Sequence, residues 1–199
     1  FGRTGTMFAV DAEGVRPDVL CLAKGITGGY LPLAATLTTD EVYRAFLGRY
    51  DEFRTFFHGH TYTGNPLGCA AGIATLDLLA RPSTWEALAR GIEALGRELT
   101  RLWAHPHVGD IRRVGLMTGI ELVADRDTKR PFPVSRRAGY RVCLAARRHG
   151  VLLRPLGDVV VINPPLTTTP AEMRRIVGAV SASLGSEFKE QRAKMAMRR

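Results

Sequence analysis

The sequence predicts an α/β protein made of part of a sheet domain, residues 1–81, and a small α+β domain, residues 82–199. Three observations support this fold class. Two short apolar runs without polar alternation flank a glycine-rich segment near residue 25, as expected of strands that are buried on both faces. After residue 83, strand-like and helix-like patterns alternate. Between the two regions, Pro82-Ser83 marks a joint in the chain.

Residues 1–81 are expected to form the sheet half of a larger α/β domain. The first helix has Asp40 as its predicted N-cap, and the second has Thr63 or Asn65 as its cap with Pro66 in its first turn. The second helix is rich in Gly, Ala and Cys, which predicts close packing on a neighbouring element. The predicted elements are strands 19–23 and 33–37, both buried on two faces, and helices 41–47 and 67–79.

Residues 82–199 are expected to form a small α+β domain. Gly150 is the predicted end of one helix, and Thr169 with Glu172 is typical of a capping box that opens the last one. The predicted elements are helix 85–104, strands 110–114 and 117–123, helix 135–149, strands 151–153 and 159–162, and helix 169–184. The first of these helices carries an apolar stripe at helical spacing, which predicts core packing: Leu88, Ile92, Leu95, Leu99 and Leu102.

Composition excludes several classes of protein. The hydrophobic content is 45% and the mean hydropathy is near zero, which is typical of a globular protein with a core. No apolar run approaches the roughly 20 residues needed to cross a bilayer, so no membrane association is predicted. The net charge of +9 raises nucleic-acid binding as an alternative. The arginines are scattered, however, and cluster only in the tail (Lys189, Arg192, Lys194, Arg198 and Arg199), so no nucleic-acid partner is predicted.

The cysteines indicate neither a disulfide framework nor a zinc site. Cys21, Cys69 and Cys143 are odd in number and far apart in the sequence. This pattern is typical of reduced, buried thiols in a cytoplasmic protein. His58 and His60 have no third ligand nearby in the sequence, so no metal is predicted.

Lys24 is the residue around which the first region is organised. It ends the apolar run that begins at Val19, and it is therefore expected at the edge of a dry core, where desolvation favours the neutral amine. A neutral, positioned lysine amine can act as a Schiff-base nucleophile. Gly25, Gly28 and Gly29 would let a bulky cofactor approach the backbone. The alternative is a strand-end lysine whose ammonium group reaches water.

Four stretches, in order, resemble the motifs of class III pyridoxal-phosphate aminotransferases. They are the loop at residues 1–9 (FGRTGTMFA), the lysine segment at 19–39, the turn at 56–66 (FFHGHTYTGNP) and the segment at 153–158 (LRPLGD). The resemblance covers nearly the whole chain and weakens after about Leu184. It implies the C-terminal part of a fold-type-I aminotransferase, because family members carry about two hundred further residues upstream, including the aspartate that binds the pyridine nitrogen.

The resemblance also implies a role for each candidate site residue. Lys24 would carry pyridoxal 5'-phosphate and act as general base and acid. The Thr61 hydroxyl and the His60 backbone amide would contact the cofactor phosphate, and the Gly59 backbone would contact the substrate. In the family this turn serves the partner subunit's active site, which implies a homodimer with shared sites. Arg154 would bind the keto-acid carboxylate, a task suited to its planar guanidinium.

Within the family, the lysine segment and the 56–66 turn are most similar to the enzymes of biotin biosynthesis that aminate 8-amino-7-oxononanoate. Some family members have a tyrosine where Val161 stands, and this leaves the amino donor open between S-adenosylmethionine and lysine. The alternatives are another class III aminotransferase, of the ω-amino-acid or acetylornithine type, and a non-catalytic aminotransferase-like remnant.

Overall fold

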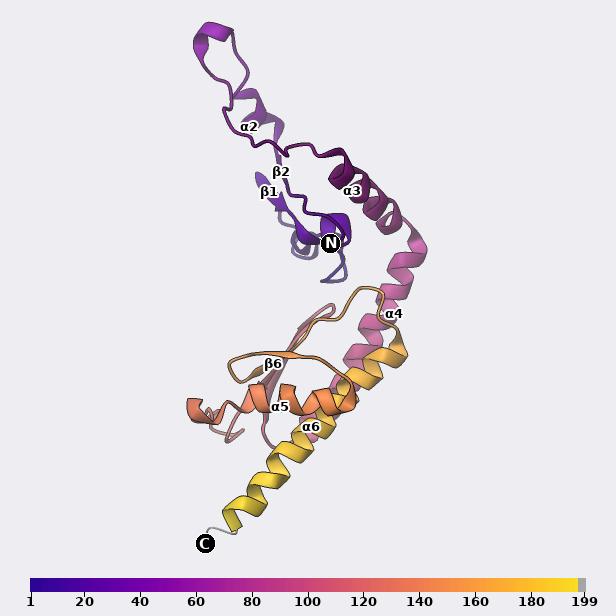
Figure 1. Cartoon of the computed structure of the whole chain (residues 1–199), viewed down its shortest axis with the longest axis vertical. Coiled ribbons are helices and arrows are strands. Elements are labelled where there is room, and N and C mark those ends of the chain that lie inside the picture. Colours follow the sequence, from indigo (N-terminus) through magenta and orange to yellow (C-terminus); the bar gives the residue numbers. More distant parts are fainter. Residues whose placement is uncertain (197–199) are drawn as a thin grey trace. The chain divides into compact units, whose positions relative to one another are not determined.

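A computed structural model describes residues 1–196, with side chains as far as residue 188. The tail cluster of five basic residues predicted from the sequence therefore lies outside the described side chains. The chain divides into two compact units. Unit 1 contains Phe1 and residues 6–84, and unit 2 contains residues 2–5 and the chain from Trp85 onward. Figure 1 shows the order of the elements along the chain.

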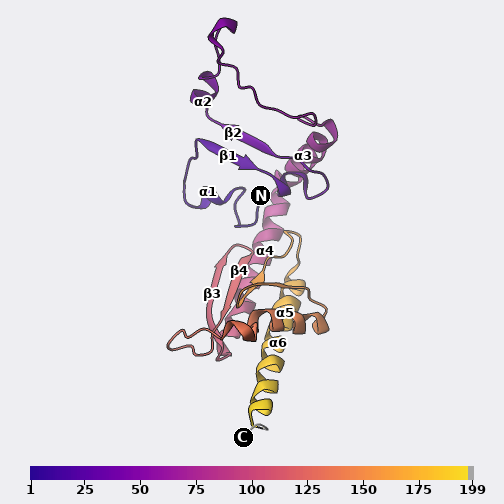
Figure 2. The same ribbon diagram turned by 60° about the vertical axis from the view of Figure 1, so that its left-hand side comes forward.

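Unit 1 contains a two-stranded antiparallel sheet and one long helix. Strand β1 pairs with β2 from Val19↔Thr38 to Leu22↔Ala35, and Figure 2 shows the two arrows side by side. The elements are α1 (Ala9–Ala12), β1 (Val19–Leu22), the 3-10 turn η1 (Lys24–Thr27), β2 (Ala35–Thr38), α2 (Asp40–Arg44), the 3-10 turn η2 (Tyr50–Glu52) and α3 (Pro66–Leu79).

The prediction that both strands are buried on two faces is wrong. Burial alternates between exposed and half-buried along β1, and three of the four residues of β2 are exposed. The physical reason is that, among the described residues, this sheet has only two strands, so no further strand or helix layer covers its faces. A short apolar run indicates strand formation but not the number of layers that pack on the strand.

Helix α3 packs against the loop that holds Lys24, and its small residues make this approach possible. Asn65 caps the helix by accepting hydrogen bonds from the backbone amides of Leu67 and Gly68, which confirms the cap and the adjacent proline. A Cβ at Gly72 would lie 3.3 Å from the Leu33 side chain. For α2 the predicted cap is wrong, because Thr39 rather than Asp40 accepts from the Val42 amide.

Unit 2 is a four-stranded antiparallel sheet, in the order β3-β4-β6-β5, that packs against three helices. Figure 2 shows β3 and β4 next to α4, and both views show α5 beside α6. The elements are α4 (Pro82–Leu99) with the 3-10 turn η3 (Thr100–Ala104), β3 (Val108–Val114), β4 (Met117–Leu122), the 3-10 turn η4 (Val134–Arg136), α5 (Ala138–Ala146) with the 3-10 turn η5 (Arg147–His149), β5 (Arg154–Leu156), β6 (Val159–Ile162) and α6 (Pro170–Ala196).

One face of this sheet forms the core with the helices. Along β4 the buried residues alternate, and Ile120 and Leu122 join Val160 and Ile162 of β6 in one apolar cluster. The predicted stripe of α4 belongs to the same cluster, with Leu88, Leu95, Leu99 and Leu102 buried and Ile92 packed against it. The stripe prediction is therefore confirmed.

Several boundaries in unit 2 differ from the prediction. Helix α4 begins at residue 82 rather than 85, β3 begins at residue 108 rather than 110, and the helix expected at 135–149 is divided into η4, α5 and η5. No strand forms at residues 151–153, because the Val151 amide still donates to the Ala146 carbonyl at the end of α5. The strand begins instead at Arg154, which pairs with Val161, and Gly157 turns the chain back into β6 with a φ of +58°. The last helix does not end at residue 184 but continues to Ala196.

The cysteines are free, as predicted, but they are not all buried. Cys143 is buried, Cys69 is half-buried and Cys21 is exposed on β1. Burial raises the pKa of the Cys143 thiol to about 11, so this group stays protonated at neutral pH. The expectation of buried thiols fails at Cys21 for the same reason that β1 is exposed.

We expect the thiols of Cys21 and Cys143 to react differently. At pH 8, iodoacetamide should alkylate Cys21 in the native chain and leave Cys143 unmodified, because the thiolate is the reactive form and access is required. Peptide mass spectrometry measures the labelling, and the same reaction in guanidinium chloride should label all three cysteines. Alkylation of native Cys143 at the rate of Cys21 would contradict the structure.

Candidate active site

Lys24 opens the 3-10 turn η1 at the end of β1. Its backbone is left-handed, with a φ of +54°, a conformation uncommon outside glycine that costs roughly 1–3 kcal/mol. The side chain is exposed, and it forms no hydrogen bond or ion pair with any residue that the structure describes. The prediction of a dry core edge around Lys24 is therefore wrong in this structure, since no second layer covers β1.

The backbone that follows Lys24 is held firmly. The Thr27 side chain is 1% exposed, and its hydroxyl donates to the Leu31 carbonyl at 2.5 Å. The Gly28 amide donates to the Gly25 carbonyl at 3.1 Å, and Ile26 is buried. These contacts stabilise the backbone that follows the strained residue, whereas the exposed Lys24 amine has no hydrogen-bond partner among the described residues.

Thr27 is the functional neighbour that the sequence reasoning missed. It stands in the segment Gly25-Ile-Thr-Gly-Gly29, where a lone polar side chain among glycines was the available signal. Of the three glycines, only Gly29 leaves open space, because a Cβ there would meet nothing within 4 Å, whereas a Cβ at Gly25 would lie 3.3 Å from the Phe1 ring. At Gly28, a φ of +63° explains why glycine is required.

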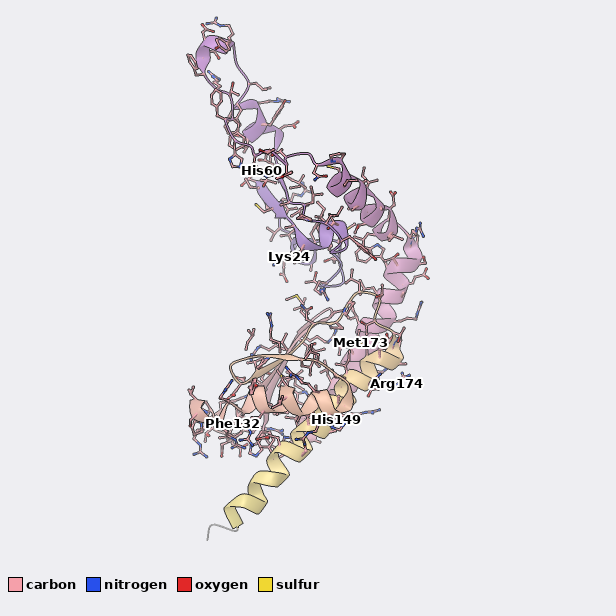
Figure 3. All side chains as sticks on the ribbon, viewed as in Figure 1. Lys24, His60, Phe132, His149, Met173 and Arg174 are labelled. Carbon is pink, nitrogen blue, oxygen red and sulfur yellow. The ribbon has the colours of Figure 1, made fainter. Side chains whose placement is uncertain are left out.

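Gly59, His60 and Thr61 lie on the exposed loop between α2 and α3, and Figure 3 labels His60 there and Lys24 at the end of β1. The His60 amide donates to the Thr63 hydroxyl at 3.1 Å, and the Thr63 amide donates to the His60 carbonyl at 3.0 Å. The loop is therefore a tight turn that already uses the His60 amide. Within the described chain, the Thr61 hydroxyl has no hydrogen-bond partner.

Arg154 lies at the start of β5 in unit 2, where it pairs with Val161. Its side chain is exposed, and no carboxylate of the described residues forms an ion pair with it. A cavity of about 410 Å³ opens beside it. Apart from Arg154 and Asn163, the cavity lining is apolar or proline: Val151, Leu152, Leu153, Val161, Ile162, Pro164, Pro165 and Ile176.

A guanidinium group at the mouth of an apolar cavity suits a ligand with a carboxylate at one end of an aliphatic chain. The predicted site residues divide between the units. Lys24, Gly59, His60 and Thr61 belong to unit 1, and Arg154 belongs to unit 2, so each group is described within its own unit. An exposed primary amine on a fixed turn can form a covalent bond with a carbonyl carbon.

Among the residues that the structure describes, no group of three or more His, Cys, Asp or Glu side chains is arranged to hold a metal ion. None of the helices described is both long enough and apolar enough to cross a membrane.

Comparisons with known proteins agree on one family. Residues 1–184 match the family model of the class III aminotransferases. The chain is 60% identical, over 184 residues, to the adenosylmethionine-8-amino-7-oxononanoate aminotransferase of Nitratidesulfovibrio vulgaris, with 92% of this chain and 34% of that protein covered. The chain spans 34–42% of the length of the first curated relatives that it matches.

Solved structures of transaminases are also similar to this chain. The structure is similar to the crystal structure of adenosylmethionine-8-amino-7-oxononanoate aminotransferase from Methanocaldococcus jannaschii, with a TM-score of 0.88 and 46% identity over 94% of this chain and 43% of that one. It is also similar to an (S)-enantioselective omega-transaminase from Thermomicrobium roseum, with a TM-score of 0.85 and 39% identity over 94% of this chain and 41% of that one.

Proposed function

Because the chain belongs to the class III aminotransferase family, we propose that it forms the lysine-bearing part of a pyridoxal-phosphate-dependent enzyme that aminates 8-amino-7-oxononanoate. The proposal rests mainly on the 60% identity, over 184 residues, to a relative whose name includes that substrate. The fold class predicted from the sequence, a partial aminotransferase fold, is confirmed by the transaminase structures that it resembles. The domain boundary at residue 81 remains a prediction.

The residues around Lys24 fit pyridoxal phosphate at its point of attachment. The amine is exposed and has no partner in the described part of the chain, and the open space at Gly29 leaves room for a ring. When bound, the cofactor supplies an electron sink for a carbanion next to the substrate amino group. We assign Lys24 Nζ to covalent attachment and then to moving the proton at the reacting substrate carbon.

The turn at residues 59–61 is assigned to the cofactor phosphate and the substrate. The Thr61 hydroxyl is available as a donor, whereas the His60 amide must leave the Thr63 hydroxyl before it can donate to a phosphate. Successive loop amides with a hydroxyl form the kind of concave donor set that binds anions. We further propose that this turn serves the site of a second copy of the protein, so that the enzyme is a homodimer.

Arg154 is assigned to the carboxylate of the keto acid. The five methylene groups that separate the carboxylate from the ketone of 8-amino-7-oxononanoate would place an aliphatic chain beside the guanidinium, and the apolar cavity lining matches that chemistry. The amino donor that we propose is S-adenosylmethionine, because the relatives' names carry it. Lysine is the competing donor, and Val161 lies next to the proposed carboxylate site in the β5–β6 pair.

Steady-state assays of the full protein with paired donors and acceptors test the function. S-adenosylmethionine with 8-amino-7-oxononanoate should give the highest kcat/KM. The similarity to the omega-transaminase from Thermomicrobium roseum favours one competitor, an ω-amino-acid aminotransferase. A higher kcat/KM with an ω-amine and pyruvate would favour that competitor, and no turnover with any pair would favour a non-catalytic protein.

We expect Arg154→Gln to weaken use of the keto acid more than use of the donor. Loss of a charge-assisted hydrogen bond of about 1.5–3 kcal/mol should raise KM for 8-amino-7-oxononanoate about 10- to 100-fold. Steady-state kinetics measures this change. Arg174→Gln is the matched control, since Arg174 is an exposed arginine of α6 outside the cavity lining. An unchanged KM in Arg154→Gln would remove Arg154 from the site.

A further inference from the structure

A second cavity in unit 2 is lined by arginines to which the proposed aminotransferase reaction assigns no role. It has a volume of about 420 Å³ and lies between the turn at η4, one face of α5 and the α6 residues Ser186 and Glu187. Three of its arginines follow one another along this part of the chain: Arg137 immediately precedes α5, Arg141 lies within it, and Arg148 lies in the turn η5 that follows. Arg136 completes the set.

Arg136 is held in position without a bound carboxylate. Its guanidinium carbon lies 3.9 Å from the centre of the Phe132 ring and 4.9 Å from that of Phe188, and these two rings stack on each other. Its Nε is buried and has no hydrogen-bond acceptor within the described residues. Burial lowers the pKa of the Arg136 guanidinium, and the charge of Glu187 partly offsets this effect. Stacking on two rings keeps the planar group preorganised.

The cavity carries more positive than negative charge. Among the described residues of the lining, Glu187 is the only carboxylate, and it pairs with Arg141 at 2.8 Å. Arg137 stacks on the Tyr140 ring at 4.2 Å and Arg148 forms no ion pair in the part of the chain described. Three guanidinium groups of the lining, those of Arg136, Arg137 and Arg148, therefore form no ion pair with a described carboxylate.

Guanidinium groups that converge on one hollow match the oxygens of a phosphate group, because each can donate two parallel hydrogen bonds. We propose that this cavity binds a small, multiply charged anion of the phosphate class, such as a diphosphate or a phosphate monoester. The alternative, an arginine-rich helix face that is simply solvated, does not explain the buried Nε or the stacked guanidinium. A nucleic-acid duplex is a poorer match, since Glu187 lies in the lining and the arginines converge rather than follow a stripe.

Isothermal titration of the full protein with inorganic pyrophosphate tests the proposal. The protein is first saturated with pyridoxal phosphate, which occupies the proposed phosphate turn at residues 59–61, and the phosphate-free buffer contains about 0.15 M salt. The wild-type protein should then bind one pyrophosphate per chain. Arg148→Gln and Arg137→Gln should each weaken binding by about tenfold or more, the loss expected for a hydrogen bond to a charged group. Titrations with inorganic phosphate and with phosphoserine then distinguish a free anion from a phosphorylated metabolite.

Arg174→Gln is the control, because it removes the same charge from α6 outside the cavity; Figure 3 labels Arg174 and Phe132 at separate places in unit 2. It should change pyrophosphate binding less than about twofold, because Arg174 is exposed and does not line the cavity, so its charge acts on the anion only through screening solvent. Equal losses in Arg174→Gln and Arg148→Gln would show non-specific attraction and overturn the proposal. Absence of binding by the wild-type chain, or displacement of pyrophosphate by a DNA duplex at lower concentration than by phosphoserine, would also overturn it.

Discussion

Replacement of Lys24 by alanine is expected to abolish covalent retention of pyridoxal phosphate and to lower the turnover number of the full protein by about 10²- to 10⁴-fold. The expected loss in rate is that of a general base and acid removed from the reacting carbon. Borohydride reduction of the wild-type protein with pyridoxal phosphate should fix the label on the peptide that contains Lys24. Peptide mass spectrometry and steady-state kinetics measure the two effects.

Lys129→Ala provides the matched control, because the chain has only four lysines and two of them lie in the tail. The Lys129 amine already donates to the Gly109 carbonyl, so it is not a free amine. This variant should keep both the label and the turnover number. A label on Lys129 or on a tail lysine, with Lys24 unmodified, would contradict the assignment of Lys24 and with it the proposed reaction.

Replacement of Leu95 by alanine should destabilise unit 2 by about 2–5 kcal/mol. The Leu95 side chain is 0% exposed in the cluster that joins α4, the sheet and α6. The lost side-chain burial and the cavity left behind both contribute to a cost of this size. Urea unfolding followed by circular dichroism measures the change as a lower midpoint with an unchanged slope.

Leu156→Ala makes the same chemical change at a position on β5 that is 61% exposed. It should alter the free energy of unfolding by no more than about 0.5 kcal/mol, as is usual for surface substitutions. Similar unfolding midpoints for the two variants would mean that Leu95 does not lie in a packed core. That result would contradict the assignment of the α4 stripe to the interior.

Most features that depend on neighbouring residues were predicted well, although Thr39 rather than Asp40 caps α2. Asn65 caps α3, and Thr169 and Glu172 form the predicted capping box, with the Thr169 amide donating to the Glu172 carboxylate at 2.7 Å. The leucine stripe of α4 is buried and strand 159–162 is present with the predicted bounds. Capping and helical periodicity act over three or four residues, so the local sequence contains the information that they need.

Features that depend on residues far apart in the sequence were not predicted correctly. The turn at Gly157 and the pairing with Val161 place a strand at Arg154–Leu156, where a strand at 151–153 was expected. Pro155 also counted against a strand at this position in the sequence, since proline is tolerated in an edge strand but argues against a central one. β5 is the edge strand of the sheet, which explains why proline is accepted there.

The sequence by itself determined the family, singled out the candidate lysine and arginine, and gave the caps of α3 and α6 and the apolar stripe of α4, because residue order and local spacing carry these properties. Only the tertiary structure decided which surfaces are covered: Lys24 is exposed on a strained turn that Thr27 holds, and four arginines converge on one cavity. Burial depends on which elements pack against a segment, and residues far apart in the sequence determine that packing.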